Sequence, residues 1–316
     1  MEIHPRSDDE LDQWVALLNL GDPAPKSVDD AVRLEAAPAG DVHARPALSG
    51  VVDGDVVAIG EARPVFGGPR GWYAVLVKVA PTYRGRGLGD VMLEAVHDAL
   101  ASEQPPGLQV SARDDDPRSR TWAEARGFDL WAHRFQSSLD VSHADLSELE
   151  RLEAEAAASG YRIIQPSPDD DRRLFELSTT LLMDAPDLDG GEPPSWELFE
   201  HSRRTLVDRA GTFVVTHGDE WVGLSELFVI AEGERYTAFT GVASGHRGRR
   251  LAELLKLKAI ACCREAGIGV MRTNNLSINA PILALNRRLG YVQEPGVWVL
   301  RRDVTTTTPH RDRRAQ

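Results

Sequence analysis

The chain has 316 residues, about twice the length of an ordinary single domain, so we expect two domains that each bury a core. Hydrophobic residues make up 42% and charged residues 27%, which is typical of a soluble folded protein. The 36 basic and 49 acidic residues give a net charge of -13, which excludes a general nucleic-acid binder and an anionic membrane surface as partner.

The sequence shows no signal for export, membrane insertion or metal binding. Residues 1–6 have neither the basic start nor the apolar run of a secretion signal, and no apolar stretch approaches the ~20 residues of a spanning helix. Cys262 and Cys263 are adjacent, so they can neither close a useful loop nor supply a four-ligand zinc site. His201, His217 and His246 show no ligand spacing, so we expect a cytoplasmic protein without a metal site.

The first elements along the chain are strands. Val51–Val52 and Val56–Arg63 flank Asp53-Gly54-Asp55, which is a hairpin turn signal, and Trp72–Val79 is a β-rich run that ends before Pro81. This pattern predicts three antiparallel strands. Apolar residues then recur at helical spacing from Leu88 to Ala99, and a short buried strand follows.

The segment between that strand and that helix is Arg84-Gly85-Arg86-Gly87-Leu88-Gly89. Its glycines let the backbone turn tightly so that several N–H groups point inward, and the helix adds the positive end of its dipole. The segment therefore predicts a phosphate site. A P-loop would need Lys-Ser or Lys-Thr after the last glycine, and a dinucleotide fingerprint would need a glycine where Asp90 stands, so both are excluded.

The second half of the chain repeats this order of elements. We expect strands near 212–216, 220–230 and 236–242, a helix over Leu251–Glu265 and a strand over 269–272. Arg84-Gly85-Arg86-Gly87-Leu88-Gly89 corresponds to Arg247-Gly248-Arg249-Arg250-Leu251-Ala252, and Gly127-Phe128 corresponds to Gly290-Tyr291, both at a separation of 163 residues. One separation for two landmarks indicates a duplicated domain.

Between the halves, Asp145–Ser159 is predicted to form a charged, alanine-rich helix. We place the boundary near Ser159-Gly160, which gives domains over residues 1–159 and 160–304. Residues 305–316 are a Thr- and Arg-rich tail that cannot bury enough apolar surface to order itself, so we expect it to be disordered.

The glycine segment resembles motif A of the GNAT acetyltransferases, which requires Arg or Gln, two residues, Gly, one residue, and Gly or Ala. The first half matches fully, whereas the second half has Arg250 in place of the first glycine. Residues 273–281 and 285–291 also resemble the strand 5, helix 4 and Leu-Gly-aromatic segment of this family. Two such domains cover nearly the whole chain, as in the mycothiol synthase type of tandem GNAT.

The resemblance implies an α/β fold of two acyl-CoA N-acyltransferase domains, each a mostly antiparallel, twisted mixed sheet whose strands 4 and 5 splay apart. It implies acetyl-CoA as cofactor and transfer of the acetyl group to a primary amine by direct attack in a ternary complex. The candidate cofactor residues are Val79, Arg84, Gly85, Arg86, Gly87, Leu88 and Gly89 in the first half, and Val242, Arg247, Gly248, Arg249, Arg250, Leu251, Ala252 and Asn279 in the second.

For the chemistry, the candidates are the backbone N–H of Val242, which would polarise the acetyl carbonyl, Asn274 on strand 5, and Glu226 as the base that receives the proton of the amine. Glu61 is the rough counterpart of Glu226 in the first half, and a solvated carboxylate is the alternative for either. Relatives place a general-acid tyrosine on helix 4, where this chain has Asn286 and Ala123. Tyr291 is expected to pack in the core instead.

The two halves depart from the family pattern differently. Asn279 corresponds to Asp116 in the first half, where an acidic group beside a polyphosphate is unfavourable. A left-handed backbone at Arg250 would lower the stability of the fold by ~1–2 kcal/mol, because the residue is not glycine. Its side chain, however, adds a positive charge beside the expected phosphate site. We therefore expect the second domain to be catalytic, while the first binds the coenzyme weakly or serves as a scaffold.

The partner is expected to be a small-molecule or peptide amine, and the protein a monomer or homodimer. The acidic loop that contains Asp184, Asp187, Asp189 and Glu192 suggests a cationic acceptor. A solvated loop without a binding role explains the same residues equally well. A non-catalytic acyl-CoA sensor or scaffold is the competing function, because the helix 4 tyrosine is missing and the motifs are imperfect.

Overall fold

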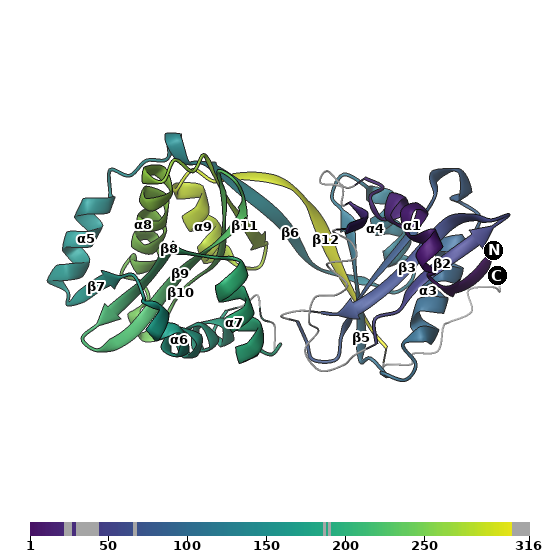
Figure 1. Ribbon diagram of the computed structural model, residues 1–316, viewed down its shortest axis with the longest axis horizontal. Helices are drawn as coiled ribbons and strands as arrows, with labels where there is room; N and C mark the ends of the chain where they lie inside the picture. The colour runs from purple at the N-terminus through teal and green to yellow at the C-terminus, as the bar shows by residue number, and fades with distance from the viewer. Residues whose placement is uncertain (22–26, 30–43, 66–67, 186–187, 189–190, 305–316) are drawn as a thin grey trace, which may run out of the picture.

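The computed structural model describes residues 1–21, 27–29, 44–65, 68–185, 188 and 191–304. It consists of two lobes, each a sheet covered by helices, that are joined by two long strands (Figure 1). The predicted tail, residues 305–316, lies outside the described residues.

The first lobe contains β1 (Glu2–Pro5), α1 (Leu11–Leu18), β2 (Ala47–Val52), β3 (Asp55–Pro64), β4 (Tyr73–Val79), α3 (Leu88–Ala99), β5 (Gly107–Arg113) and α4 (Pro117–Glu124). The second lobe contains α5 (Leu149–Ala158), β7 (Tyr161–Ile164), α6 (Asp171–Met183), α7 (Trp196–Thr205), β8 (Val207–His217), β9 (Glu220–Ala231), β10 (Glu234–Val242), α8 (Leu251–Glu265), β11 (Val270–Leu276) and α9 (Ala280–Arg288). The joining strands are β6 (Asp129–Asp140) and β12 (Val292–Asp303).

Local sequence explains these elements. Asp53 and Gly54 both have positive φ, at 53° and 89°, as the two central residues of a tight hairpin turn require, and the predicted β2–β3 hairpin is confirmed. The helix predicted from Leu88 to Ala99 has the bounds that the apolar spacing indicated, and so does the helix over Leu251–Glu265. The predicted strand over 269–272 is longer and runs to Leu276.

The strands of the described chain form one twelve-stranded sheet in the order β1-β2-β3-β4-β5-β12-β6-β11-β10-β9-β8-β7. All neighbours are antiparallel except β4 with β5 and β10 with β11. These parallel pairs are short, because β4 meets β5 only at Tyr73 and Ala74, and β10 meets β11 only from Glu234 to Tyr236. The mixed sheet with a splayed parallel pair in each lobe is therefore confirmed.

The last strand of each half crosses into the other lobe. β6 pairs with β11 of the second lobe from Arg134 to Asp140, and β12 pairs with β5 of the first lobe from Val297 to Asp303. Between these contacts β6 and β12 pair with each other, and Figure 1 shows them as the ribbon that connects the lobes. The sequence did not predict this exchange, because two copies of one domain offer each strand two equivalent places.

The helix between the halves packs on the second lobe. Val141, Ala144, Leu152 and Ala156 belong to the same buried cluster as Leu254 of α8. A boundary near Ser159-Gly160 would separate α5 from the core that it covers. We propose that the boundary lies instead where β6 ends, near Asp140.

The duplication extends to backbone detail. The α3–α4 and α8–α9 segments keep the separation of 163 residues, since Leu88 and Leu251 both begin a helix and Pro117 and Ala280 begin the next one. Near the start of each half the separation is 160, because Ser7 with Glu10 and Ser167 with Asp170 both form a capping box before α1 and α6. The two lobes are therefore copies with one topology.

Candidate active site

Both glycine segments form the same turn between a strand and a helix. Arg84 Nε donates to Val79 O at 3.0 Å, and Arg247 Nε donates to Val242 O at 2.9 Å, so each arginine ties the turn to the end of its strand. A Cβ added at Gly85, Gly87 or Gly248 would meet nothing within 4 Å. The first N–H groups of α3 and α8 have no intrahelical partner, so each turn is an open backbone site for an anion.

The residue before each helix has a left-handed backbone. Gly87 has φ 77° and ψ 1°, and Arg250 has φ 58° and ψ 17° at the equivalent place. The predicted strain at Arg250 is thus present, since a residue with a Cβ pays about 1–2 kcal/mol for this conformation. Its side chain has compensating contacts.

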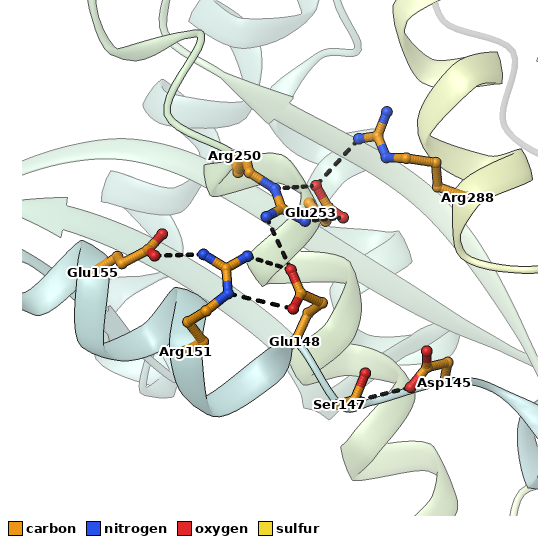
Figure 2. Close-up of polar contacts among 8 residues, drawn as sticks. All are labelled: Asp145, Ser147, Glu148, Arg151, Glu155, Arg250, Glu253 and Arg288. Atoms are coloured by element: carbon orange, nitrogen blue, oxygen red, sulfur yellow. Dashed lines mark hydrogen bonds and ion pairs between the residues drawn. The ribbon is translucent and has the colours of Figure 1, made fainter.

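Figure 2 shows those contacts. The Arg250 guanidinium donates to both oxygens of Glu253 at 2.8 Å and to Glu148 at 3.0 Å. Glu253 also accepts from Arg288 at 3.1 Å, and its side chain is only 7% exposed. The Arg250 bonds lower the pKa of Glu253 although burial opposes them, so this carboxylate stays charged. Arg250 therefore offers a phosphate its backbone N–H, while its cation already has two carboxylate partners.

The strand edges beside each turn face the splayed gap. Ala243 N donates to Val222 O of β9 at 2.8 Å, and successive N–H groups of a strand point to opposite edges. The N–H of Val242 consequently points away from β9, toward β11. In the first lobe Ala80 N donates to Val57 O of β3 at 2.8 Å, so the N–H of Val79 points away from β3, toward β5.

Strand β10 contains a bulge that β4 lacks. Thr237 pairs with Leu227 and Phe239 pairs with Glu226, which leaves Ala238 as an extra residue on β10. The pairing of β3 with β4 runs without interruption from Ala58 to Pro64. Bulges re-aim neighbouring groups and occur often beside active sites, so the two lobes differ at the middle of the splayed strand.

Glu226 is a carboxylate in a charged cluster, and its side chain is 12% exposed. It accepts from Arg203 Nη1 at 2.9 Å, and Arg203 Nε also donates to Asp171 at 3.1 Å. Burial raises the pKa of Glu226, and Arg203 only partly opposes this. Strand pairing supports Glu61 as its counterpart, since Glu61 faces Leu76 and Glu226 faces Phe239, which is 163 residues after Leu76.

The predicted acidic acceptor residues do not form one described cluster. Asp184 accepts from Arg247 Nη2 at 3.2 Å, so it lies beside the turn of the second lobe. Glu192 is 3.4 Å from Arg70 of the first lobe, and both side chains are largely exposed. Asp187 and Asp189 lie outside the described residues. Asn274 pairs with Gln136 on β6 and is exposed on the face opposite Asn275.

In the first lobe, side chains of both splayed strands bind the segment that follows α1. Lys78, at the end of β4, donates to Leu18 O and, at 2.9 Å, to Leu20 O. Arg113, at the end of β5, donates to Gly21 O. The segment after α1 is thus bonded to both splayed strands. The equivalent of Lys78 in the second lobe is Gly241, which has no side chain to make such a contact.

Asp116 and Asn279 are helix caps. Asp116 accepts from the N–H groups of Arg118 and Ser119 at 3.2 and 3.3 Å, and Asn279 accepts from Ile282 N at 3.5 Å. Hydrogen bonding from Ser119 lowers the pKa of Asp116. The first lobe therefore keeps a negative charge where the second has a neutral cap.

Sequence reasoning singled out Asn286 and Tyr291 but missed that they belong to a larger set of buried polar residues in the second lobe. They share low exposure, between 2% and 6%, and they are Ser137, Lys256, Thr273, Asn275, Asn286 and Tyr291. The repeat itself carried the signal, because a shift of 163 residues places these positions on Leu300, Leu93, Val110, Ala112, Ala123 and Phe128. Tyr291 packs in the core as expected.

No group of three or more metal-binding side chains occurs among the described residues. In the same part of the chain, no helix is long and apolar enough to cross a membrane.

The comparisons with known proteins agree with this geometry. Residues 11–128 match the model of the acetyltransferase (GNAT) family. A mycothiol acetyltransferase of Thermobispora bispora is 27% identical over 230 residues, which cover 68% of this chain and 71% of that protein. A GCN5-related N-acetyltransferase from Sphaerobacter thermophilus has a TM-score of 0.72 at 16% identity, covering 96% of this chain and 95% of that one. A tandem GNAT protein from the clavulanic acid biosynthesis pathway has a TM-score of 0.65 at 20% identity, covering 96% and 98%.

Two lobes of one topology, each with a parallel strand pair that separates beside a glycine turn and a helix start, define a tandem GNAT fold. Residues 11–128 match the GNAT family and the whole chain has the fold of tandem GNAT proteins, so the resemblance drawn from its sequence is confirmed.

Proposed function

We propose that the second lobe transfers an acetyl group from acetyl-CoA to a primary amine of a small molecule or peptide. The turn of residues 247–252 suits the phosphates, because it combines open backbone N–H groups, a helix start and arginine side chains. Bound there, acetyl-CoA would supply an activated acetyl thioester. The residues of the chain would bind it, orient it and take up the proton of the amine.

The observation that carries the choice of lobe is the asymmetry of the two gaps. In the second lobe the middle strand is bulged at Ala238, and Glu226 lies across from the bulge. In the first lobe the strand is regular, and Lys78 and Arg113 tie the segment after α1 to both splayed strands. Gly241 cannot make the contact of Lys78, and this difference supports access of an amine to the gap of the second lobe.

The second lobe also holds groups for the proton and the carbonyl. The N–H of Val242 points into the gap, where it can donate to a carbonyl oxygen. Because burial raises the pKa of Glu226, this carboxylate holds a proton more readily than an exposed one, as a general base near neutral pH requires.

Alanine substitution in the two turns tests the assignment. We expect Arg247→Ala to reduce the release of coenzyme A thiol from acetyl-CoA, measured with a panel of amines, by at least about 10-fold, since a charge-assisted contact is worth about 1.5–3 kcal/mol. Arg84→Ala is the matched control and should leave turnover within about twofold. The reverse result would assign catalysis to the first lobe. Binding of the coenzyme without turnover by any amine would favour a sensor.

A further inference from the structure

The buried polar residues of the second lobe occupy positions that are apolar core in the first lobe. Leu93, Val110, Ala112, Ala123, Phe128 and Leu300 all lie in one buried hydrophobic cluster. Their counterparts in the second lobe, Lys256, Thr273, Asn275, Asn286, Tyr291 and Ser137, are equally buried. A buried polar group lowers the stability of the folded state unless it is hydrogen-bonded. The second lobe bears this loss of stability, although the first lobe shows that the same fold can be built with apolar residues at these positions.

Three of these residues form a hydrogen-bonded chain from the sheet to α9. Asn286 Nδ2 donates to Asn275 Oδ1 at 2.8 Å, and Asn275 Nδ2 donates to Ser137 Oγ at 2.9 Å. Asn286 is 3% exposed, and the oxygen end of its amide has no hydrogen-bond partner among the described residues. The chain therefore fixes Asn286 while leaving one end of the amide unused.

The chain of bonds lies beside the gap. Pairing of β10 with β11 ends at Tyr236 with Arg272, and there Thr273 Oγ1 reaches Thr237 O at 3.4 Å. Asn275 points to the same face of β11 as Thr273 and lies two residues further on, about 7 Å along the strand. At that point β11 has no strand partner on the β10 side, so Asn275 and Asn286 stand where the strands have separated.

Ser137 comes from β6, the strand that the first half contributes to the second lobe, and it faces Thr273 of β11. Ser137, which fixes Asn275 and through it Asn286, thus belongs to the first half of the chain. The site of the second lobe is incomplete without the first half.

We propose that Asn286 binds an amide group of the coenzyme A arm and that Ser137 is a positioning residue that acts through Asn275. This rests on the proposed function, because it takes the gap of the second lobe as the place of the arm. The arm carries two amide groups, which can pair with the unused end of the Asn286 amide. The first half is then needed for binding of the arm and not only for folding.

Binding of two ligands by the full-length chain tests the proposal, with isothermal titration calorimetry as the readout. Coenzyme A has the arm, whereas adenosine 3′,5′-bisphosphate has the adenosine, the 3′-phosphate and the first 5′-phosphate without it. We expect Asn286→Ala, which introduces the residue of the first lobe, to weaken coenzyme A binding about fivefold and to leave the bisphosphate unchanged. Ser137→Ala should weaken coenzyme A about twofold to threefold, and Ser137→Thr, which keeps the hydroxyl, should restore it.

The controls separate the possible outcomes. Ser138→Ala changes the neighbour on the opposite face of β6 and should alter neither affinity. An equal loss of both ligands in Asn286→Ala would show a structural role and overturn the proposal, and so would a coenzyme A affinity within 1.5-fold, roughly the error of such titrations. Arg247→Ala identifies the binding event of the second lobe. If it leaves coenzyme A binding unchanged, the proposed function itself fails.

Discussion

At the scale of single residues, Lys256 is a buried ionisable residue in the second lobe where the first lobe has the apolar residue Leu93. It is 2% exposed, and its Nζ lies 4.8 Å from the ring centre of Tyr291 without a hydrogen-bond partner among the described residues. Burial lowers the pKa of Lys256 from 10.5 to about 7. Between these two values the unfolded chain holds the proton and the folded chain does not, so the stability contributed by this residue rises with pH across that window. Below pH 7 the folded state carries the full cost of a buried cation.

We therefore expect Lys256→Leu, which introduces the counterpart residue Leu93, to raise the free energy of unfolding at pH 7 by on the order of 2–4 kcal/mol. The gain should shrink as the pH approaches 10. Urea unfolding at pH 6, 7, 8.5 and 10 measures both effects. Lys258→Met is the matched control on the same helix, because Lys258 is paired with Glu153 near the surface and should contribute less than about 1 kcal/mol. A gain that is independent of pH would contradict the titration of Lys256.

At the scale of elements, the end of α1 depends on a side chain from the sheet. Lys78 donates to the carbonyl of Leu18, which ends α1 and has no intrahelical donor, and to the carbonyl of Leu20, two residues beyond the helix. We expect Lys78→Met to cost about 1–3 kcal/mol and to speed amide exchange in α1 (Leu11–Leu18). Exchange monitored by mass spectrometry measures this, with Arg63→Met on β3 as a control whose contact to Glu61 is weak and exposed. Unchanged exchange in α1 would show that the segment is held by other contacts.

Elements were also what the sequence predicted best. The hairpin at Asp53-Gly54, the helix from Leu88 and its copy from Leu251 follow from turn chemistry and apolar spacing, which are local. The two glycine turns could be located for the same reason. The partners of Glu226 could not, because Arg203 and Asp171 come from α7 and from the start of α6 and meet it only through tertiary packing.

At the scale of the whole molecule, the exchange of β6 and β12 makes the lobes depend on each other. Leu300 of β12 is fully buried in the core of the first lobe, and Leu139 of β6 is buried in the core of the second. Neither the length nor the repeat indicated this, because local pattern identifies a strand but not which of two identical sheets receives it.

A chain cut after Asp140 tests this dependence. We expect residues 1–140 and 141–316 to show no cooperative thermal transition when each is produced alone, because each lacks the last strand of its own sheet. Mixed together, they should restore one transition and elute as a 1:1 complex. Circular dichroism and size-exclusion chromatography measure these outcomes. Two separate, stable fragments would show that the exchange is dispensable for folding.

The exchanged strands also bear on how the two copies could diverge. A duplicated gene usually loses the copy whose activity is no longer selected, but here each copy supplies a strand without which the other sheet has an open edge. The two copies can therefore differ in their buried residues, as Leu93, Ala112 and Ala123 differ from Lys256, Asn275 and Asn286, while each still completes the sheet of the other. Removing either copy would open a strand edge in the one that remains.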